Sequence, residues 1–307
     1  MTYTTGLHHV TAICSTPKEN VRFYRDVLAL AFVKQTVNQD DPTTYHLYYA
    51  DEQASAGALM TFFPWMHLPQ AQAGMSESRM TSFSIPTGAI SYWQKRLAEH
   101  DVSARVVTRF GEQRLEFQDS HGLPLALVEA GEEETRPPTT PKVPKEVAIR
   151  GFRGVTLCVR ETKPTKEILI AMGYEEESQE GSYTRLINPH SEFKTVFDLD
   201  KQPSLPVARQ GVGATHHVAF RAQDYKEQRQ LKQLVEDLGM HATHSINRFY
   251  FKSVYFREPN GVLFELATDG PGFAVDEPAD QLGQKLVLPP WLEKHREEIQ
   301  EALPPLD

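Results

Sequence analysis

The 307-residue sequence is poor in cysteine and lacks long apolar runs. Its two cysteines, Cys14 and Cys158, lie in separate strand-like stretches without a close cysteine partner. This excludes a disulfide framework and a cysteine-rich zinc motif, and it predicts two reduced core thiols. No run approaches the roughly 20 apolar residues of a membrane-spanning helix, and the N-terminus does not resemble a secretion signal. We therefore expect a cytoplasmic protein without a membrane partner.

Basic residues are outnumbered by acidic ones, with 32 Lys and Arg against 41 Asp and Glu, which gives a net charge of −9. The acidic residues are spread along the chain apart from one short block, 132–134. This argues against electrostatic attraction to nucleic acid or to an anionic membrane. The composition is that of an ordinary globular protein, and the length allows two domains. Homo-oligomerisation is left open.

The sequence contains a fourfold repeat. Each copy opens with a short apolar strand, continues into an amphipathic helix and then gives two or three further strands. Such a unit has a curled sheet that needs a partner to bury its face. The pattern therefore predicts an α+β fold of four βαβββ modules that form two cup-shaped half-barrels. The expected helices are Pro17–Leu28, Ile90–His100, Thr165–Met172 and Tyr225–Leu238.

The domain organisation follows the repeat. Residues 1–130 are expected to form an N-terminal domain of modules one and two, and residues 150–270 a C-terminal domain of modules three and four. Between them, residues 131–149 are interpreted as a linker because their first part is acidic and rich in proline. The tail, 271–307, is Pro-rich and is expected to end in a short helix, Pro290–Ala302.

Two pairs of histidines occupy matching strands. His8 and His9 open the first strand of copy one, and His216 and His217 open the first strand of copy four, 208 residues later. The last strand of copy four carries one carboxylate, Glu265. Two imidazoles and one carboxylate form a facial triad that leaves metal coordination positions open, a set that suits iron activating oxygen.

Comparison of the copies assigns this set to a single site. Alignment on the first strands places His9 beside His217, Gly154 and Ser82, so copies two and three lack the histidine. Alignment on the turn before the last strand places Glu265 beside Ala126 of copy two and Thr61 of copy one, and we expect copy four alone to keep a carboxylate. Copies one and four should therefore share one cup, and copies two and three the other.

Each histidine pair poses a problem of orientation. Successive strand residues point to opposite faces, so His8 and His9 cannot both face the cup interior of a regular strand. We expect one histidine of each pair to bind metal and the other to lie at the rim or on the other face.

These residues resemble the vicinal oxygen chelate superfamily, which includes glyoxalases, bleomycin resistance proteins and extradiol dioxygenases. In that superfamily a His-hydrophobic-x-hydrophobic strand and a Pro-x-Gly turn before a Glu-bearing strand supply metal ligands, and helix text such as Phe23–Leu28 is typical. Over nearly its whole length the chain looks most like the hydroquinone-cleaving ring-cleavage dioxygenases. The resemblance implies His9, His217 and Glu265 as ligands of Fe(II), with Mn(II) or another divalent metal as alternatives.

The same resemblance implies a site around the metal made of His8, His216, Thr11, Arg248 and Tyr255, and a reaction that opens a hydroquinone-like or catechol-like ring with both atoms of O2. A base near neutral pKa is needed for the ring hydroxyl, and His216 or His8 is the candidate. Arg248 and Tyr255 could donate hydrogen bonds to a phenolate or to developing negative charge on oxygen.

Plainer interpretations remain for several of these residues. His8 and His216 could be structural, Arg248 could be a surface ion-pair partner, Tyr255 could be a packing residue, and Thr11 suits a strand without any catalytic role. The aromatic clusters 62–66 and 249–251 are expected to be mostly core, with a pocket for an aromatic ring as the alternative for part of them. The remaining histidines are expected to be solvated polar residues: His46, His67, His100, His121, His190, His241, His244 and His295.

Two other functions fit the same sequence. One is a glyoxalase-like isomerase or transferase that uses Ni, Zn or Mn, although such sites usually add a second Glu where copy one has Thr61. The other is a small-molecule binding protein without chemistry, although such binders often lose the metal ligands.

Overall fold

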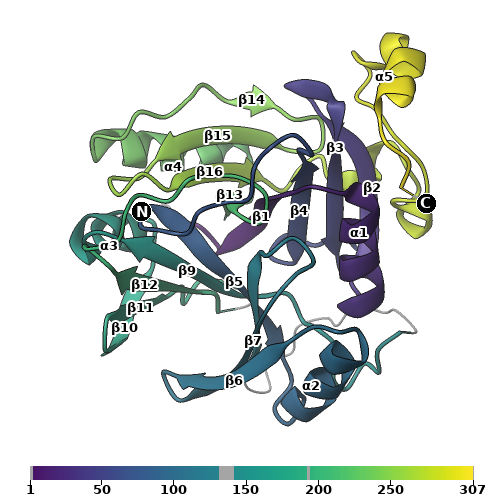
Figure 1. Cartoon of the computed structure of the whole chain (residues 1–307). Coiled ribbons are helices and arrows are strands. Elements are labelled where there is room, and N and C mark those ends of the chain that lie inside the picture. The colour runs from purple at the N-terminus through teal and green to yellow at the C-terminus, as the bar shows by residue number, and fades with distance from the viewer. Residues whose placement is uncertain (1–2, 131–141, 192–193, 307) are drawn as a thin grey trace.

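The computed structural model describes residues 3–130, 142–191 and 194–306, and within these ranges each repeat forms a βαβββ module (Figure 1). Module one consists of β1 (Leu7–Cys14), α1 (Pro17–Val21), the π-helix η1 (Arg22–Val27), β2 (Ala31–Asn38), β3 (Asp41–Ala50) and β4 (Leu59–Pro64). Module two consists of β5 (Glu77–Ile85), α2 (Ile90–Glu99), β6 (Ala104–Arg109), β7 (Glu112–Gln118) and β8 (Pro124–Glu129).

Modules three and four repeat this order. Module three consists of β9 (Phe152–Val159), α3 (Thr162–Ala171), β10 (Glu175–Glu180), β11 (Tyr183–Ile187) and β12 (Val196–Lys201). Module four consists of β13 (Thr215–Ala222), α4 (Tyr225–Asp237), β14 (Ile246–Asn247), β15 (Lys252–Arg257) and β16 (Leu263–Thr268). The tail carries the short 3-10 helices η2 (Phe273–Val275), η3 (Ala279–Gln281) and η4 (Glu293–His295), followed by α5 (Arg296–Ala302). The predicted architecture of four modules is confirmed.

The strands form two eight-stranded sheets that do not follow the two halves of the sequence. Modules one and four share the sheet β14-β15-β16-β13-β1-β4-β3-β2, in which β1 and β13 pair antiparallel. Modules two and three share the sheet β10-β11-β12-β9-β5-β8-β7-β6, joined through β5 and β9. The predicted pairing of copies one and four is therefore confirmed. We refer to the two sheets as the first and the second cup.

The proposed domain boundaries stay a prediction. Residues 131–141 of the expected linker lie outside the described residues. The rest of the linker is not a solvated spacer, because Val143, Ala148 and Ile149 pack into the main apolar cluster. No helix in the described ranges is long and apolar enough to cross a membrane.

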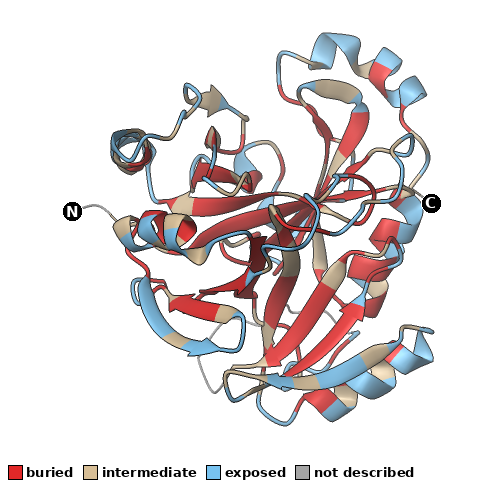
Figure 2. Cartoon of the chain, turned by 60° about the vertical axis from the view of Figure 1, so that its left-hand side comes forward, coloured by how far each residue is buried: buried red, intermediate tan, exposed pale blue. Residues whose placement is uncertain are grey.

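The alternation of β1 explains how one strand serves both the core and a site. Val10, Ala12 and Cys14 pack into the apolar cluster beneath the helices, whereas His9 and Thr11 point to the opposite face. The central strands of both sheets are largely buried, whereas the edge strands β6 and β10 and the outer faces of the helices are largely exposed (Figure 2). The cup interior is thus free to carry polar side chains. Both cysteines are free and buried, as predicted.

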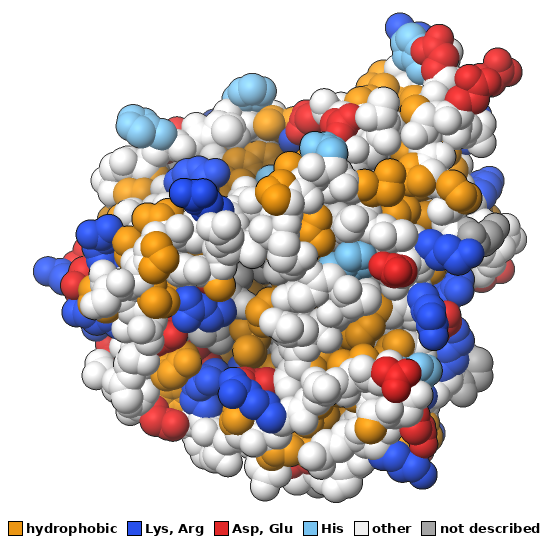
Figure 3. All heavy atoms as spheres, viewed as in Figure 1, with side chains coloured by type: hydrophobic (Ala, Val, Ile, Leu, Met, Phe, Trp, Pro, Cys, Tyr) orange, Lys and Arg blue, Asp and Glu red, His pale blue; other side chains and the backbone are white. Residues whose placement is uncertain are grey.

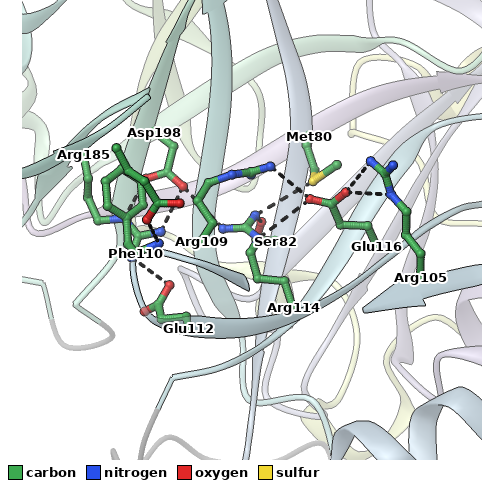
Figure 4. Close-up of polar contacts among 11 residues, drawn as sticks. Met80, Ser82, Arg105, Arg109, Phe110, Glu112, Arg114, Glu116, Arg185 and Asp198 are labelled. Atoms are coloured by element: carbon green, nitrogen blue, oxygen red, sulfur yellow. Dashed lines mark hydrogen bonds and ion pairs between the residues drawn. The ribbon is translucent and has the colours of Figure 1, made fainter. Parts of the chain in front are cut away.

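The interior of the second cup is occupied by paired charges (Figure 4). Asp198 on β12 accepts hydrogen bonds from Nε and Nη2 of Arg185, at 2.7 and 2.9 Å, and from Nη1 of Arg114 at 3.3 Å. Arg185 also donates to Glu112 at 2.7 Å, and Arg114 donates to Ser82 at 2.8 Å. The side chains of Asp198 and the two arginines are 1–2 % exposed. Each buried charge therefore has a counter-charge supplied by the protein itself.

This arrangement predicts that the second cup depends on Asp198 for stability. Asp198→Ala leaves two buried guanidiniums without their shared carboxylate and should lower the free energy of unfolding by about 3–5 kcal/mol. Urea denaturation followed by circular dichroism measures the change. In the matched control, Lys163→Ala breaks a surface ion pair with Glu167, and the loss should stay within about 1 kcal/mol. Equal losses in the two variants would contradict this account.

Candidate metal centre

Three residues from three strands of the first cup converge. His9 on β1, His217 on β13 and Glu265 on β16 are buried, and their ligand atoms form the one cluster of this kind within the described ranges. The Nε2 atoms of the two histidines lie 3.1 Å apart. Glu265 Oε2 lies 3.2 Å from Nε2 of His9 and 2.9 Å from Nε2 of His217. The three residues predicted as ligands are therefore brought together.

The spacing of these atoms fits a divalent metal bound on one face of an octahedron. With metal–ligand bonds of about 2.1 Å, adjacent octahedral ligands lie about 3.0 Å apart, and tetrahedral ligands about 3.4 Å apart. The three observed separations, 2.9 to 3.2 Å, surround the octahedral value. Two histidines and one carboxylate on a face are the donor set of non-haem Fe(II) oxygenases.

The state of Glu265 also calls for a cation. Burial alone would raise its pKa, but the adjacent rings of His9 and His217 hold the pKa well below its usual range, so the carboxyl is ionised. Both Nε2 atoms lie within 3.2 Å of Oε2, and no other donor reaches either carboxylate oxygen. A buried carboxylate is costly unless positive charge accompanies it, and a metal bound between the two imidazoles would supply that charge.

The histidine pairs owe their arrangement to two β-bulges between β1 and β13. Leu7 pairs with Phe220 and His9 with Ala219, so His8 is an extra residue on β1. The second bulge makes His216 the extra residue on β13 in the same way, because Thr11 pairs with His217 and Ala12 with Thr215. The expected alternation of faces is therefore relaxed at both pairs.

As a result, each extra histidine contacts its neighbour's ring directly. Nδ1 of His8 lies 2.9 Å from Nδ1 of His9, and Nδ1 of His216 lies 2.7 Å from Nδ1 of His217. Burial, followed by the neighbouring histidine, lowers the pKa of both His8 and His216 to about 3, so both are neutral. In each pair one ring presents Nε2 to the cluster. The other ring, which we call the bracing histidine, contacts Nδ1 of the first ring.

The two pairs differ in what the bracing histidine faces. His216 lines a cavity of about 290 Å³ that opens on His9 and His217. His8 does not line this cavity and borders a separate hollow that contains Arg221 and Asp269. Of the two predicted base candidates, His216 alone reaches the space beside the cluster.

Aromatic side chains form much of the cavity wall. Phe63 and Trp65 lie beside the ring of His216, with ring centroids 5.7 and 5.6 Å away. Phe251 lies beside the ring of His9, at 5.3 Å. The two aromatic clusters of the sequence thus divide between core and cavity. A larger hollow of about 870 Å³, between η1 and β6–β7, contains none of the three converging residues.

Arg248 and Tyr255 both line the cavity. Arg248 donates two hydrogen bonds to the exposed Asp40, at 3.0 and 2.8 Å, and its guanidinium lies 5.6 Å from the centre of the Tyr255 ring. Burial opposes the charge on Arg248, but Asp40 more than offsets this and raises its pKa. Burial and the nearby Glu265 raise the pKa of Tyr255, which stays a neutral phenol. Arg248 is therefore both an ion-pair partner and a cavity residue.

Thr11 belongs to a hydrogen-bonded chain that includes a histidine missed by the sequence analysis. Its hydroxyl lies 2.7 Å from that of Thr61, which lies 3.0 Å from Nε2 of His46. Nδ1 of His46 lies 2.7 Å from the hydroxyl of Tyr48, and both residues line the cavity. Burial lowers the pKa of His46 well below its usual value. The expectation of a solvated His46 is therefore wrong.

His121 is the other exception among the eight remaining histidines. It is 7 % exposed, and its Nε2 accepts a hydrogen bond from the Thr16 backbone amide. The other six are exposed, as expected. The signal for His46 was available, because His46 and Tyr48 alternate on one face of a strand.

The registers correct the alignment of the four copies. Met80, and not Ser82, matches His9, because the bulges of the second cup make Arg79 and Arg153 the extra residues. Ser82 is the partner of Ala126 on the neighbouring strand. Copies two and three still lack the histidine, with Met80 and Gly154 at its position.

The expectation that copy four alone keeps a carboxylate is wrong. Glu265 lies beside Ala219, two residues past His217, and Asp198 lies beside Thr156, two residues past Gly154. Copy three therefore has an aspartate at the same position. There the two arginines of the second cup neutralise it, and no histidine accompanies it.

The face of the molecule seen in Figure 3 carries basic and acidic side chains interspersed. The predicted absence of a nucleic-acid or membrane partner, and the oligomeric state, stay predictions.

Comparison with known proteins agrees with the fold. The family model for the glyoxalase/bleomycin resistance protein/dioxygenase superfamily matches residues 6–266. A protein of Bacillus subtilis strain 168 named "Putative ring-cleaving dioxygenase MhqO" is 42 % identical, over 99 % of this chain and 97 % of its own length. A "Chlorohydroquinone/hydroquinone 1,2-dioxygenase" of Sphingobium indicum is 31 % identical, over 96 % of this chain and 94 % of its own.

Solved structures extend the comparison to three dimensions. The crystal structure of a putative dioxygenase from Bacillus subtilis superposes with a TM-score of 0.96 at 41 % identity, and the match covers 100 % of this chain and 99 % of that one. Glyoxalase I from Zea mays superposes with a TM-score of 0.63 at 13 % identity, over 86 % and 92 % of the two chains, and shares the fold alone. The two curled sheets are those of the vicinal oxygen chelate fold, and the chain belongs to the glyoxalase/bleomycin resistance protein/dioxygenase superfamily.

Proposed function

We propose that this protein is an Fe(II)-dependent ring-cleaving dioxygenase that opens a hydroquinone-like or catechol-like ring with O2. The observation that carries the proposal is the cluster of His9, His217 and Glu265, spaced as one octahedral face and open to a cavity with aromatic walls. The names of the relatives, which include ring-cleaving and hydroquinone dioxygenases, support the reaction class.

The three converging residues would hold the metal. When bound, Fe(II) supplies adjacent open coordination positions and the redox chemistry that activates O2. Mn(II) or another divalent ion fits the same donors. The two neutral imidazoles and the ionised Glu265 would leave one net positive charge at the centre, which favours a deprotonated ring hydroxyl.

The cavity suits a single aromatic ring. Its volume of about 290 Å³ lies just below the roughly 300–1,000 Å³ of ligand pockets, as suits a small substrate. Phe63, Trp65 and Phe251 line it and can contact the faces or edges of a bound ring. Arg248 and Tyr255 offer hydrogen-bond donors that can hold a phenolate oxygen or developing negative charge.

The hydrogen bonds between the paired histidines define where protons reside. A histidine that binds metal through Nε2 carries its proton on Nδ1 and donates it to the second ring. His217 then donates to Nδ1 of His216, and His216 carries its own proton on Nε2. In this arrangement His216 acts as a hydrogen-bond donor toward the cavity, which fits the geometry better than the role of general base. The same logic makes His8 a brace for His9.

A different pair is placed to contact the ring hydroxyl. Tyr48 lines the cavity, and its hydroxyl lies 2.7 Å from Nδ1 of His46. Burial keeps His46 neutral, so its Nδ1 can accept the Tyr48 proton as a hydrogen bond and leave the Tyr48 oxygen free to accept one from the ring hydroxyl. Arg248 and Tyr255 line the same cavity and would also contact the substrate.

The first experiment tests the activity itself. Protein purified anaerobically and loaded with Fe(II) should consume one O2 per ring opened when hydroquinones or catechols are supplied, with a new product absorbance. An oxygen electrode and a spectrophotometer follow both signals. Metal-loaded protein that shows no uptake across the panel would overturn the proposal in favour of an isomerase or a binding protein.

The second experiment separates ligands from bracing residues. His217→Ala should lose stoichiometric iron, because one ligand is removed from the cluster. His216→Ala should retain iron at saturating metal and lose rate by roughly 10–100-fold. Iron content and oxygen uptake are measured together.

Two further variants complete this comparison. His8→Ala should mainly weaken iron affinity, because His8 does not line the cavity. The exposed His241→Ala serves as the control and should change neither quantity. Equal loss of iron in His216→Ala and His217→Ala would show that the pair is assigned wrongly.

The third experiment addresses the glyoxalase-like alternative. Thr61 occupies in copy one the position that Glu265 occupies in copy four, because each lies beside the residue two past the candidate ligand. Thr61→Glu should add a fourth ligand, keep or tighten metal binding and lower oxygen uptake by roughly 100-fold or more, the scale of losing a well-positioned reactant. Thr61→Val is the control for the lost hydroxyl. Uptake retained in Thr61→Glu would argue against open positions on that side.

A further inference from the structure

The C-terminal tail runs along the first cup and is joined to it by backbone hydrogen bonds. The amide of Gly272 donates to the carbonyl of Tyr250 at 2.8 Å, and the amide of Val287 donates to the carbonyl of Gln35 at 3.0 Å. In Figure 1 the tail, drawn in yellow, lies beside β2 and β3. The tail is therefore packed on the sheet that holds the metal cluster.

A buried lysine ties the tail to this sheet. Lys34 on β2 has no exposed side-chain surface, and its Nζ donates to Asp276 at 2.8 Å and to Glu277 at 2.5 Å. The Tyr250 hydroxyl donates to the other oxygen of Asp276 at 2.8 Å. A fully buried ammonium persists only when it is paired, so this contact cannot open without a large cost.

Phe273, three residues before Asp276, connects the tail to the cavity wall. Its ring centroid lies 5.1 Å from that of Tyr48, 5.3 Å from that of Tyr250 and 6.2 Å from that of Phe251. Tyr48 and Phe251 line the cavity, whereas Phe273 does not. Phe273 therefore packs against two residues of the cavity wall, Tyr48 and Phe251, without lining the cavity itself.

The supported wall reaches the metal cluster directly. The ring of Phe251 lies 5.2 Å from that of His8 and 5.3 Å from that of His9. Tyr48 holds His46 through its hydroxyl. A shift of either aromatic ring would change the space beside His9.

We propose that the tail is part of the catalytic cup, with Phe273 as a positioning residue whose ring fixes the wall of Tyr48 and Phe251 and so limits the size of ring substituent that the cavity accepts. The proposal rests on the proposed ring-cleaving function for its substrate class. Protein interiors are close-packed, and a void behind an aromatic wall lets that wall relax into it. The space gained lies beside the candidate ligand His9.

The test uses the full-length, iron-loaded protein and the variant Phe273→Leu. Two probes are compared, hydroquinone and tert-butylhydroquinone, by kcat/KM in air and by anaerobic binding calorimetry. The ratio of the bulky to the small probe should rise by about tenfold, since a change of one or two methylenes in a pocket discriminates on that scale. Iron content should be unchanged.

The matched control is Leu288→Ala. Leu288 is also a buried tail residue, but it packs in the main apolar cluster and not with Tyr48 and Phe251. Leu288→Ala should lower the melting temperature by about as much as Phe273→Leu does. The ratio of kcat/KM for the bulky and the small probe should stay within about twofold of the parent value. A second variant, Lys34→Met, should raise the ratio in the same direction as Phe273→Leu, because it releases the tail at a distance from the cavity.

The outcomes separate this inference from the proposed function. An unchanged probe ratio in folded, iron-loaded Phe273→Leu overturns the role of Phe273, whatever the activity of the parent protein. An equal rise in Leu288→Ala also overturns it, because the effect would then follow stability alone. If the parent protein consumes no oxygen, the calorimetric ratio still tests the wall, and the failure belongs to the proposed reaction.

Discussion

The carboxylate of Glu265 sets the requirement around which the first cup is built. It is fully buried, and the only groups that approach its oxygens are the imidazoles of His9 and His217, so its charge is balanced when those rings hold a cation beside it. The second cup shows another solution at the same structural position. There Asp198 is met by Arg114 and Arg185, and the charges balance within the protein. One fold thus satisfies two equivalent buried carboxylates, one with arginines and the other with two imidazoles that leave room for a metal.

The bulges make the imidazole solution workable. In a regular strand the residue before a ligand would point away from it, but an extra residue in each of β1 and β13 turns His8 and His216 toward the rings that follow them. Each candidate ligand then has a hydrogen-bond partner on Nδ1, which fixes both the tautomer and the tilt of the ring. The second cup uses the same bulge positions for Arg79 and Arg153, which brace carboxylates and carbonyls.

The sequence was sufficient for the parts of the molecule that local patterns encode. The repeat predicted four modules, and the distribution of His9, His217 and Glu265 predicted that modules one and four share a sheet. The register of module two could not be obtained in this way, because side chains alternate with a period of two and a shift of two residues leaves the apolar pattern unchanged. The sequence alignment therefore placed Ser82 beside His9, where the structure places Met80. The spacing of His46 and Tyr48 shows that they share one face of a strand, but it does not bring them to the site. The place of His46 beside Thr61 depends on pairing between β3 and β4.

The residue at position 61 also affects which reaction a metal at this site would favour. With two neutral imidazoles and one carboxylate, a divalent metal keeps one positive charge and open positions, which suits an anionic ring oxygen and O2 together. A second carboxylate at Thr61 would cancel that charge and fill a position. Instead the Thr61 hydroxyl is held between Thr11 and His46, so it is turned toward neighbouring side chains. A glutamate at position 61 would supply the fourth ligand of a non-oxidative site. Here Thr61 instead belongs to the hydrogen-bonded chain that runs through His46 to Tyr48 in the cavity wall.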